Sequence, residues 1–231
     1  GGYTTDTGAR LEARYSHYNT FGRAWVTDFQ ARLEQRRQLG ALDLSMPPGR
    51  GGHVNSAHAS LERTTLEGVQ LNSRRVGLRR AVVTDTRDHT FSLEFYRDEL
   101  QQLSGTPLPP GTVVEPGAHK ALLLGYSLAR RNVDDPRFPR RGNISNAEAG
   151  VAVKPILTDQ TFIRLYGKLR HFRPVGRTDI LILRAELGAV MTKNGGNASI
   201  PASLLFRAGG TESVRGYSYQ SIGNVRSGTV F

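Results

Sequence analysis

The sequence predicts an all-β protein made of antiparallel strands, and three observations lead to this prediction. Polar and apolar residues alternate with a period of two over most of the 231 residues, as in strands with one polar and one apolar face. The alternating segments are about ten residues long and are separated by turn signals rich in glycine, proline and aspartate. Helical periodicity is almost absent, and 95–103 is the one segment where a helix could compete with a strand.

The clearest alternation lies in 178–191, where every second residue from Leu181 to Met191 is apolar and the opposite parity contains Arg184 and Glu186. Other segments share this pattern. In chain order they are 10–17 (Leu11, Ala13, Tyr15), 23–34 (Trp25, Phe29, Leu33), 54–65, 71–83, 90–100 (Phe91, Leu93, Phe95), 118–130 (Leu122, Leu124, Tyr126, Leu128), 144–154 and 160–171 (Ile163, Leu165, Leu169). With short candidates at the ends, the count is about eleven strands.

Segments rich in residues that interrupt strands occur where hairpin connections between these strands are expected. They lie at 19–22, 47–52, 84–88, 105–117, 134–142, 173–177 and 193–201. No linker or second domain separates from this pattern, so we expect residues 1–231 to belong to one domain.

Composition excludes several functional classes. The chain has no cysteine, which rules out thiol catalysis, disulfides and zinc–cysteine sites. No apolar run approaches the roughly 18 residues of a membrane-spanning helix. The six histidines show no HExxH spacing, and GxSxG and Walker patterns are missing, so we expect no catalytic residue, no metal and no cofactor.

The chain is strongly basic, with 31 Lys and Arg against 20 Asp and Glu, a net charge of +11. Such an excess suits nucleic acid, anionic lipid or a polar interior. The arginine pairs are spread along the chain and often fall on strands, where neighbouring residues point to opposite faces and form no single patch. We therefore expect no nucleic-acid partner.

Periodicity leaves two architectures open, a soluble β-sandwich and a transmembrane β-barrel, because both alternate in the same way. The second face of several strands is small and polar, as in Gly125, Ser127 and Ala129. This composition favours a water-filled interior.

The stretch 206–219 reads FRAGGTESVRGYSY and resembles the sixth external loop of the outer-membrane assembly-factor superfamily that includes BamA, TamA and the two-partner secretion transporters. Its core there is VRGY or VRGF. The loop residues that this resemblance marks as functional are Phe206, Gly209, Gly210, Val214, Arg215, Gly216, Tyr217 and Tyr219. Within the superfamily, the flanking residues look most like TamA, and 1–15 and 134–142 are similar to its first hairpin and its aspartate–proline-rich turn.

The resemblance implies an antiparallel transmembrane β-barrel in the outer membrane of a Gram-negative bacterium. In this family about sixteen antiparallel strands close a barrel, and periplasmic POTRA modules precede the barrel in the chain. We therefore expect an incomplete barrel, about eleven strands of a longer protein without the POTRA modules, in which the loop 192–224 folds inward. There Arg215 meets an acidic residue, expected after Phe231, with Glu148 and Glu186 as substitutes.

The implied function is non-enzymatic. A weak seam at strand 1–5 opens sideways, so that client outer-membrane or autotransporter strands can add to its edge. Membrane lipid and a TamB-like inner-membrane protein are the other implied partners. Two alternatives remain open: a two-partner secretion transporter that exports a soluble adhesin, and a soluble basic β-sandwich that binds polyanions.

Overall fold

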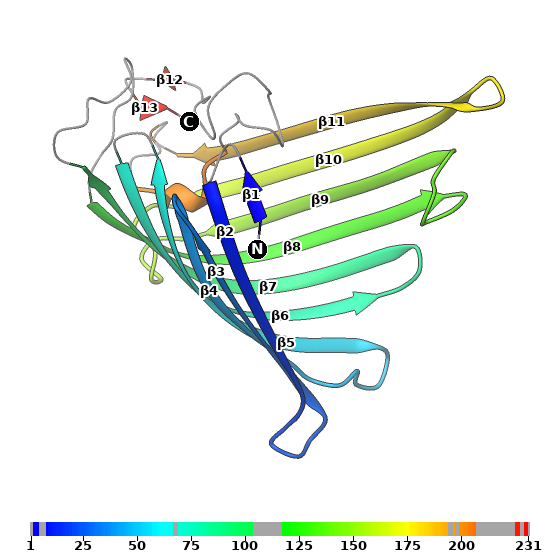
Figure 1. The fold of residues 1–231 in the computed structure, drawn as a ribbon. Helices are drawn as coiled ribbons and strands as arrows, with labels where there is room; N and C mark the ends of the chain where they lie inside the picture. Colours follow the sequence, from blue (N-terminus) through cyan, green and yellow to red (C-terminus); the bar gives the residue numbers. More distant parts are fainter. Residues whose placement is uncertain are drawn as a thin grey trace.

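Eleven antiparallel strands form one sheet in which every strand lies beside its neighbours in sequence (Figure 1). The computed structural model describes residues 2–4, 8–66, 69–103, 117–193, 196, 199–206, 225–226 and 229–230. The strands of the sheet are β1 (Gly2–Thr4), β2 (Gly8–Thr20), β3 (Trp25–Glu34), β4 (Arg37–Ser45), β5 (His53–Leu66), β6 (Val69–Val83), β7 (Arg87–Gln102), β8 (Gly117–Val133), β9 (Gly142–Ala152), β10 (Phe162–Val175) and β11 (Asp179–Thr192). One short 3-10 helix, η1 (Ala202–Leu204), comes next, and β12 (Val225–Arg226) and β13 (Thr229–Val230) form a separate ladder.

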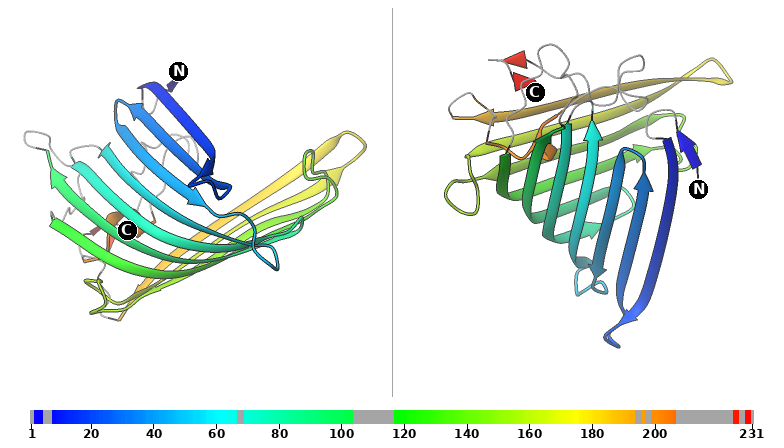
Figure 2. Two further views of the ribbon diagram at one scale, coloured as in Figure 1. Left: turned by 90° about the horizontal axis from the view of Figure 1, so that it is seen from below. Right: turned by 60° about the vertical axis from the view of Figure 1, so that its left-hand side comes forward.

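The sheet curves into an open trough (Figure 2). Within the described residues, β1 and β11 are its two edges and do not pair with each other. The all-β prediction and the expected number of strands are confirmed. The soluble β-sandwich is wrong, because no second sheet covers the apolar face in the described part of the chain.

The convex face of the trough is apolar. Leu11 pairs with Leu33, and Tyr15 with Phe29, so apolar side chains of neighbouring strands lie side by side on one face. These side chains stay exposed, as Leu11 does at 61%. An uncovered apolar face of this extent is unusual in water, and it fits an apolar surrounding.

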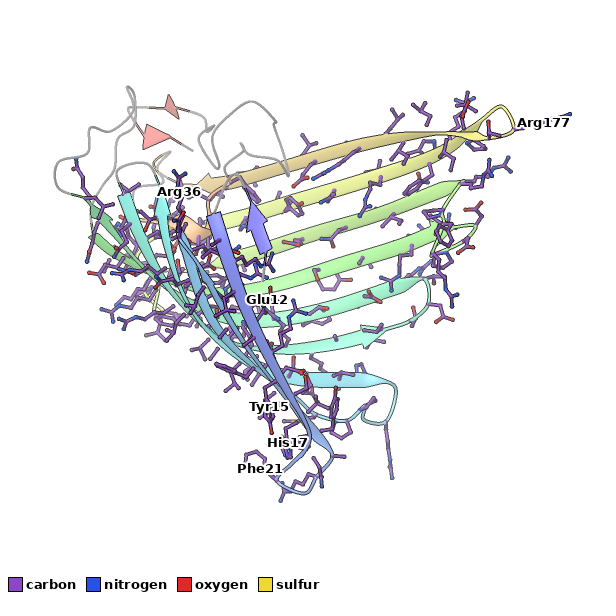
Figure 3. The ribbon with its side chains drawn as sticks, in the orientation of Figure 1. Glu12, Tyr15, His17, Phe21, Arg36 and Arg177 are labelled. Carbon is purple, nitrogen blue, oxygen red and sulfur yellow. The ribbon has the colours of Figure 1, made fainter. Side chains whose placement is uncertain are left out.

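Most of the concave face is polar and charged. On β2, Glu12 pairs with Arg10 and Arg14 and also accepts a hydrogen bond from Gln30 of β3. Figure 3 shows Glu12 partway along β2. The alternation predicted from sequence is thus confirmed, and each parity has a defined face.

Two parts of the sheet differ from expectation. The segment 95–103, where a helix could compete, belongs almost entirely to β7, because Phe95 is paired on both sides, with Val76 and with Leu122. Strand β4 does not stand out in the sequence, since its leucines fall on both parities.

Several strands are longer than a bilayer requires. β7 has 16 residues and β8 has 17, whereas about 9–11 tilted residues cross the hydrocarbon core.

In an antiparallel meander, alternate connections lie at the same rim of the sheet. The turns at Phe21 and Arg177, labelled in Figure 3, therefore belong to the same rim. No helix in the described residues is long and apolar enough to cross a membrane.

Candidate functional site

The segment after β11 returns to the concave face of the sheet. Its residues 199–206 include η1, and Ile200 and Leu204 are 2% and 3% exposed. They pack into one apolar cluster with residues of the wall. These wall residues are Tyr96, Ala121, Leu123, Ala152 and Phe162. Burying each large apolar side chain contributes about 1.5–3 kcal/mol, so the segment is held to the wall by its own apolar residues.

A buried carboxylate adds a polar tether to this packing. The backbone N–H of Ser203 donates a hydrogen bond to Oδ2 of Asp98 over 2.7 Å, and Asp98 on β7 is only 2% exposed. Among the described residues, the second carboxylate oxygen of Asp98 and the hydroxyl of Ser203 are buried without a partner. The hydrogen bond from Ser203 makes Asp98 a specific attachment point for η1.

Arg164 on β10 binds the same segment at a second place. Its Nε donates to the backbone carbonyl of Leu204 over 3.1 Å, and its Nη1 lies 3.2 Å from Glu148. The guanidinium also lies 4.3 Å from the ring centre of Phe206, within the range of a cation–π contact. One side chain therefore joins the wall to both the backbone and the side chain of the returning segment.

The half-buried ring of Phe206 also contacts residues of β10 and β11. It stacks on Tyr166 with ring centres 5.7 Å apart and planes at 11°. Gly188 lies under the ring, where a Cβ atom would come within 2.7 Å of the phenyl carbons. Gly188 thus leaves the space that the phenyl ring occupies. We call Arg164, Tyr166 and Gly188 the Phe206 pocket.

Two carboxylates bind the polar groups of the pocket residues Arg164 and Tyr166. Glu148 pairs with Arg164, and Glu186 accepts a hydrogen bond from the Tyr166 hydroxyl over 2.7 Å. Glu186 also pairs with Arg184 over 2.8 Å. Both glutamates lie on the concave face, as the sequence predicted, and both already have cationic or hydroxyl partners in the described structure.

A second charged cluster surrounds Glu94 of β7. Arg79 contacts one oxygen of Glu94 at 3.0 Å, and the Tyr96 hydroxyl donates to the other over 2.5 Å. His58 lies 3.2 Å from Arg79, and Gly77 leaves room for its imidazole. Three residues of this cluster and four of the returning segment line a polar cavity of about 520 Å³; they are His58, Arg79, Tyr96, Ala202, Ser203, Leu205 and Phe206. Within the described residues, no group of three or more His, Asp or Glu side chains could hold a metal ion.

Of the predicted site residues, the structure describes Phe206, which lies at the centre of the contacts above. The remaining ones lie outside the described residues. They are Gly209, Gly210, Val214, Arg215, Gly216, Tyr217 and Tyr219.

The sequence did not identify Asp98, Arg164, Gly188 or Ser203 as site residues. Alternation assigns Arg164 to the polar face together with many other arginines, and nothing local distinguishes it. The contact between Asp98 and Ser203 joins positions 105 apart in sequence. The available signal was Gly188, an isolated glycine inside a regular strand pattern, which often marks a close approach of another group.

The aspartate–proline-rich turn between β8 and β9 is organised by one carboxylate. Oδ1 of Asp134 accepts hydrogen bonds from the backbone N–H groups of Arg141, Arg140 and Asp135. These bonds, that of Arg141 first, hold the pKa of Asp134 below its ordinary value. The carboxylate therefore stabilises the turn above the ordinary pKa of about 3.9, and this stabilisation is lost as the pH falls through the lower folded-state pKa.

Replacing Asp134 with alanine is expected to loosen this turn at neutral pH, because three backbone N–H groups lose their common acceptor. Trypsin should then cleave at Arg137 and at the following arginines several times faster. Asp134→Asn is the matched control, since its amide oxygen still accepts hydrogen bonds. Equal cleavage rates in Asp134→Ala and the unmodified protein would contradict this role of the carboxylate.

The fold has a clear counterpart among solved structures. The crystal structure of BamA from Haemophilus ducreyi lacking POTRA domains 1-3 matches with a TM-score of 0.76 over 96% of this chain, at 14% sequence identity. The match covers 45% of that BamA chain, so this chain spans less than half of its length. No curated protein matches the chain in sequence.

The sequence itself identifies the family. Residues 19–230, from the end of β2 to β13, match the model of the Omp85 superfamily domain. The structure agrees with that assignment, because the chain is all-β, forms an open meander with an apolar convex face and matches the structure of BamA. The chain belongs to the Omp85 superfamily and forms part of its β-barrel.

Proposed function

We propose that this chain forms part of the barrel wall of an outer-membrane assembly factor. This factor helps to insert or secrete β-barrel proteins of the autotransporter type. The observation that carries the proposal is the return of 199–206 to the concave face. This segment leads directly into the VRGY motif at 214–217. We infer that loop 192–224 belongs to the same barrel domain and that Arg215, with Val214, Gly216 and Tyr217, acts inside the barrel.

The first strand supports lateral opening as the mechanism. β1 pairs with β2 through Gly2, Tyr3 and Thr4 and is an edge of the sheet within the described residues. An edge strand leaves one row of N–H and C=O groups unpaired, so a client strand can add there by β-augmentation.

The proposed location is the outer membrane of a Gram-negative bacterium, with lipid against the convex face. Client outer-membrane proteins are the proposed partners, together with a TamB-like inner-membrane protein. The TamA-like assignment rests on FRAGGTESVRGYSY and its flanks. The number of POTRA modules encoded upstream distinguishes a TamA-like protein from a two-partner secretion transporter.

The proposal can be tested by depleting the full-length protein in its native host. Surface exposure and heat-modifiable folding of an autotransporter barrel should fall, and the secretion of soluble adhesins should persist. Loss of a soluble adhesin from the medium with normal autotransporter assembly would instead identify a secretion transporter.

The seam can be tested separately, because the chain has no cysteine of its own. A single Tyr3→Cys substitution in β1 should form disulfide cross-links to cysteines placed in a client's terminal strand. A cysteine at an outward position of β5, as in Ala59→Cys, lies far from either edge of the sheet. It should form no such cross-link. Equal cross-linking at both positions would argue against a seam at β1.

A further inference from the structure

We propose that the Phe206 pocket is a docking site that fixes where the VRGY-bearing loop enters the barrel, and that Arg164 is its principal positioning residue. The inference rests on the proposed function, because it assigns the pocket to the loop of that function. It concerns a contact between described parts of the chain, so it can be tested without any client protein.

The geometry of the pocket is specific for a planar aromatic ring. Arg164 and Tyr166 are two residues apart on one face of β10, and Gly188 is the cross-strand partner of Tyr166 on β11. The ring of Phe206 stacks on Tyr166, lies beside the Arg164 guanidinium and covers Gly188. Any larger residue at 188 would place its Cβ where the ring lies, so the glycine acts as the floor of the pocket.

The wall side of the pocket is held by contacts that do not involve the loop. Glu148 of β9 holds the Arg164 guanidinium, and Glu186 of β11 holds the Tyr166 hydroxyl. Each carboxylate comes from a strand next to β10, so the side chains of Arg164 and Tyr166 are oriented by neighbouring strands of the sheet. Pre-oriented groups lose little side-chain freedom when the ring docks.

Docking at Phe206 restricts the positions that the rest of the loop can reach. Arg215 is nine residues further on, and nine extended residues span at most about 30 Å. With Ser203 held by Asp98 and Phe206 held by the pocket, the point from which the loop continues is fixed, and the reach available to Arg215 is measured from that point.

A single cysteine can report on docking. In Ser203→Cys, the thiol would replace a buried hydroxyl that has no hydrogen-bond partner among the described residues, and the tether to Asp98 uses the backbone N–H. In the full-length protein in outer membranes, this thiol should react slowly with a water-soluble maleimide. No other thiol in this chain competes, because it has no cysteine.

Removing either part of the pocket should expose the thiol. Arg164→Ala frees the carbonyl of Leu204, which lies in the same helical turn as Ser203, and Gly188→Ala displaces the ring. We expect each change to accelerate labelling about tenfold. Gly167→Ala on β10 is the matched control, since a Cβ there meets nothing within 4 Å, and its labelling should not change.

Two additional variants separate docking from general loosening. Arg164→Lys keeps the charge facing Glu148 but loses the planar contact with the ring, so its labelling rate should lie between those of the parent and Arg164→Ala. In the Phe206→Ala background, Gly188→Ala should add no further acceleration, because the ring it displaces is gone. Heat-modifiable mobility of each variant verifies that the barrel still folds.

Slow labelling that persists in either Arg164→Ala or Gly188→Ala overturns the proposal, as does equal acceleration in Gly167→Ala. An additive effect of Gly188→Ala and Phe206→Ala overturns it as well. These results are independent of client assembly, which tests the proposed function and is measured separately in the depletion experiment.

Discussion

Replacing Arg215 with alanine in the full-length protein is expected to lower client assembly by roughly tenfold or more, with a much smaller fall in the amount of folded barrel. The reason is that a guanidinium confined in a barrel interior requires a carboxylate partner, and removing one member of a buried pair costs about 3–5 kcal/mol. We propose that this loss falls on the placement of the loop, because the ladder hydrogen bonds of the described strands join wall residues to one another.

The measurement compares surface-exposed autotransporter with heat-modifiable barrel in the same membranes. Arg215→Lys tests the geometry of the pair, since lysine keeps the charge but cannot form a bidentate contact. Arg207→Ala, a nearby arginine outside the VRGY motif, is the control and should have little effect. Parallel loss of client assembly and of folded barrel in Arg215→Ala would point to a purely structural role.

The strands and their faces could be predicted because both depend on local information. In β10 and β11, alternation alone places Ile163 and Met191 on one face and Arg164 on the other, and the observed register pairs Ile163 with Met191 as that assignment requires. A one-residue shift in register would move every side chain to the wrong face. Strand β4 is not evident from the sequence because Leu39 lies on the concave face among polar neighbours, which weakens its alternation.

Alternation could not decide between a sandwich and a barrel, because both bury one face of every strand. The motif at 214–217 led to the barrel, and the family match over 19–230 and the structural match to BamA confirmed it. What no local pattern could supply was the docking of 199–206. Its contacts join Ser203 to β7 and Phe206 to β10 and β11, and apart from the isolated Gly188 such long-range pairs leave no trace in the spacing of residues.

The Phe206 pocket also changes how Glu148 and Glu186 are interpreted. The sequence offers both as partners for Arg215 because they face the interior. In the structure each supports a side chain that touches Phe206, one through Arg164 and the other through Tyr166. A carboxylate with such partners contributes to the loop by orienting the wall, whatever group Arg215 meets. The effect of Arg215→Ala is therefore expected to be separable from that of Arg164→Ala.

The second large effect concerns the convex face. Leu124→Arg, near the middle of β8, is expected to destabilise the folded barrel by about 2–4 kcal/mol, because an arginine at the bilayer midplane is costly on the lipid-facing side of a strand. Leu124 is 57% exposed on the face opposite to Gly125 and Ser127. Urea-induced unfolding of the full-length protein in lipid vesicles measures this loss.

The matched control is Ser127→Arg on the same strand. Ser127 points to the concave face and is the cross-strand partner of Glu148 on β9, so a guanidinium there meets water and a carboxylate. Its unfolding midpoint should stay close to that of the parent protein. If both substitutions were equally tolerated, the convex face would be in contact with water, and the apolar alternation from Leu11 to Met191 would need another explanation. If Ser127→Arg were the more damaging of the two, the assignment of the faces would be reversed, and with it the interior position of Arg164 and Phe206.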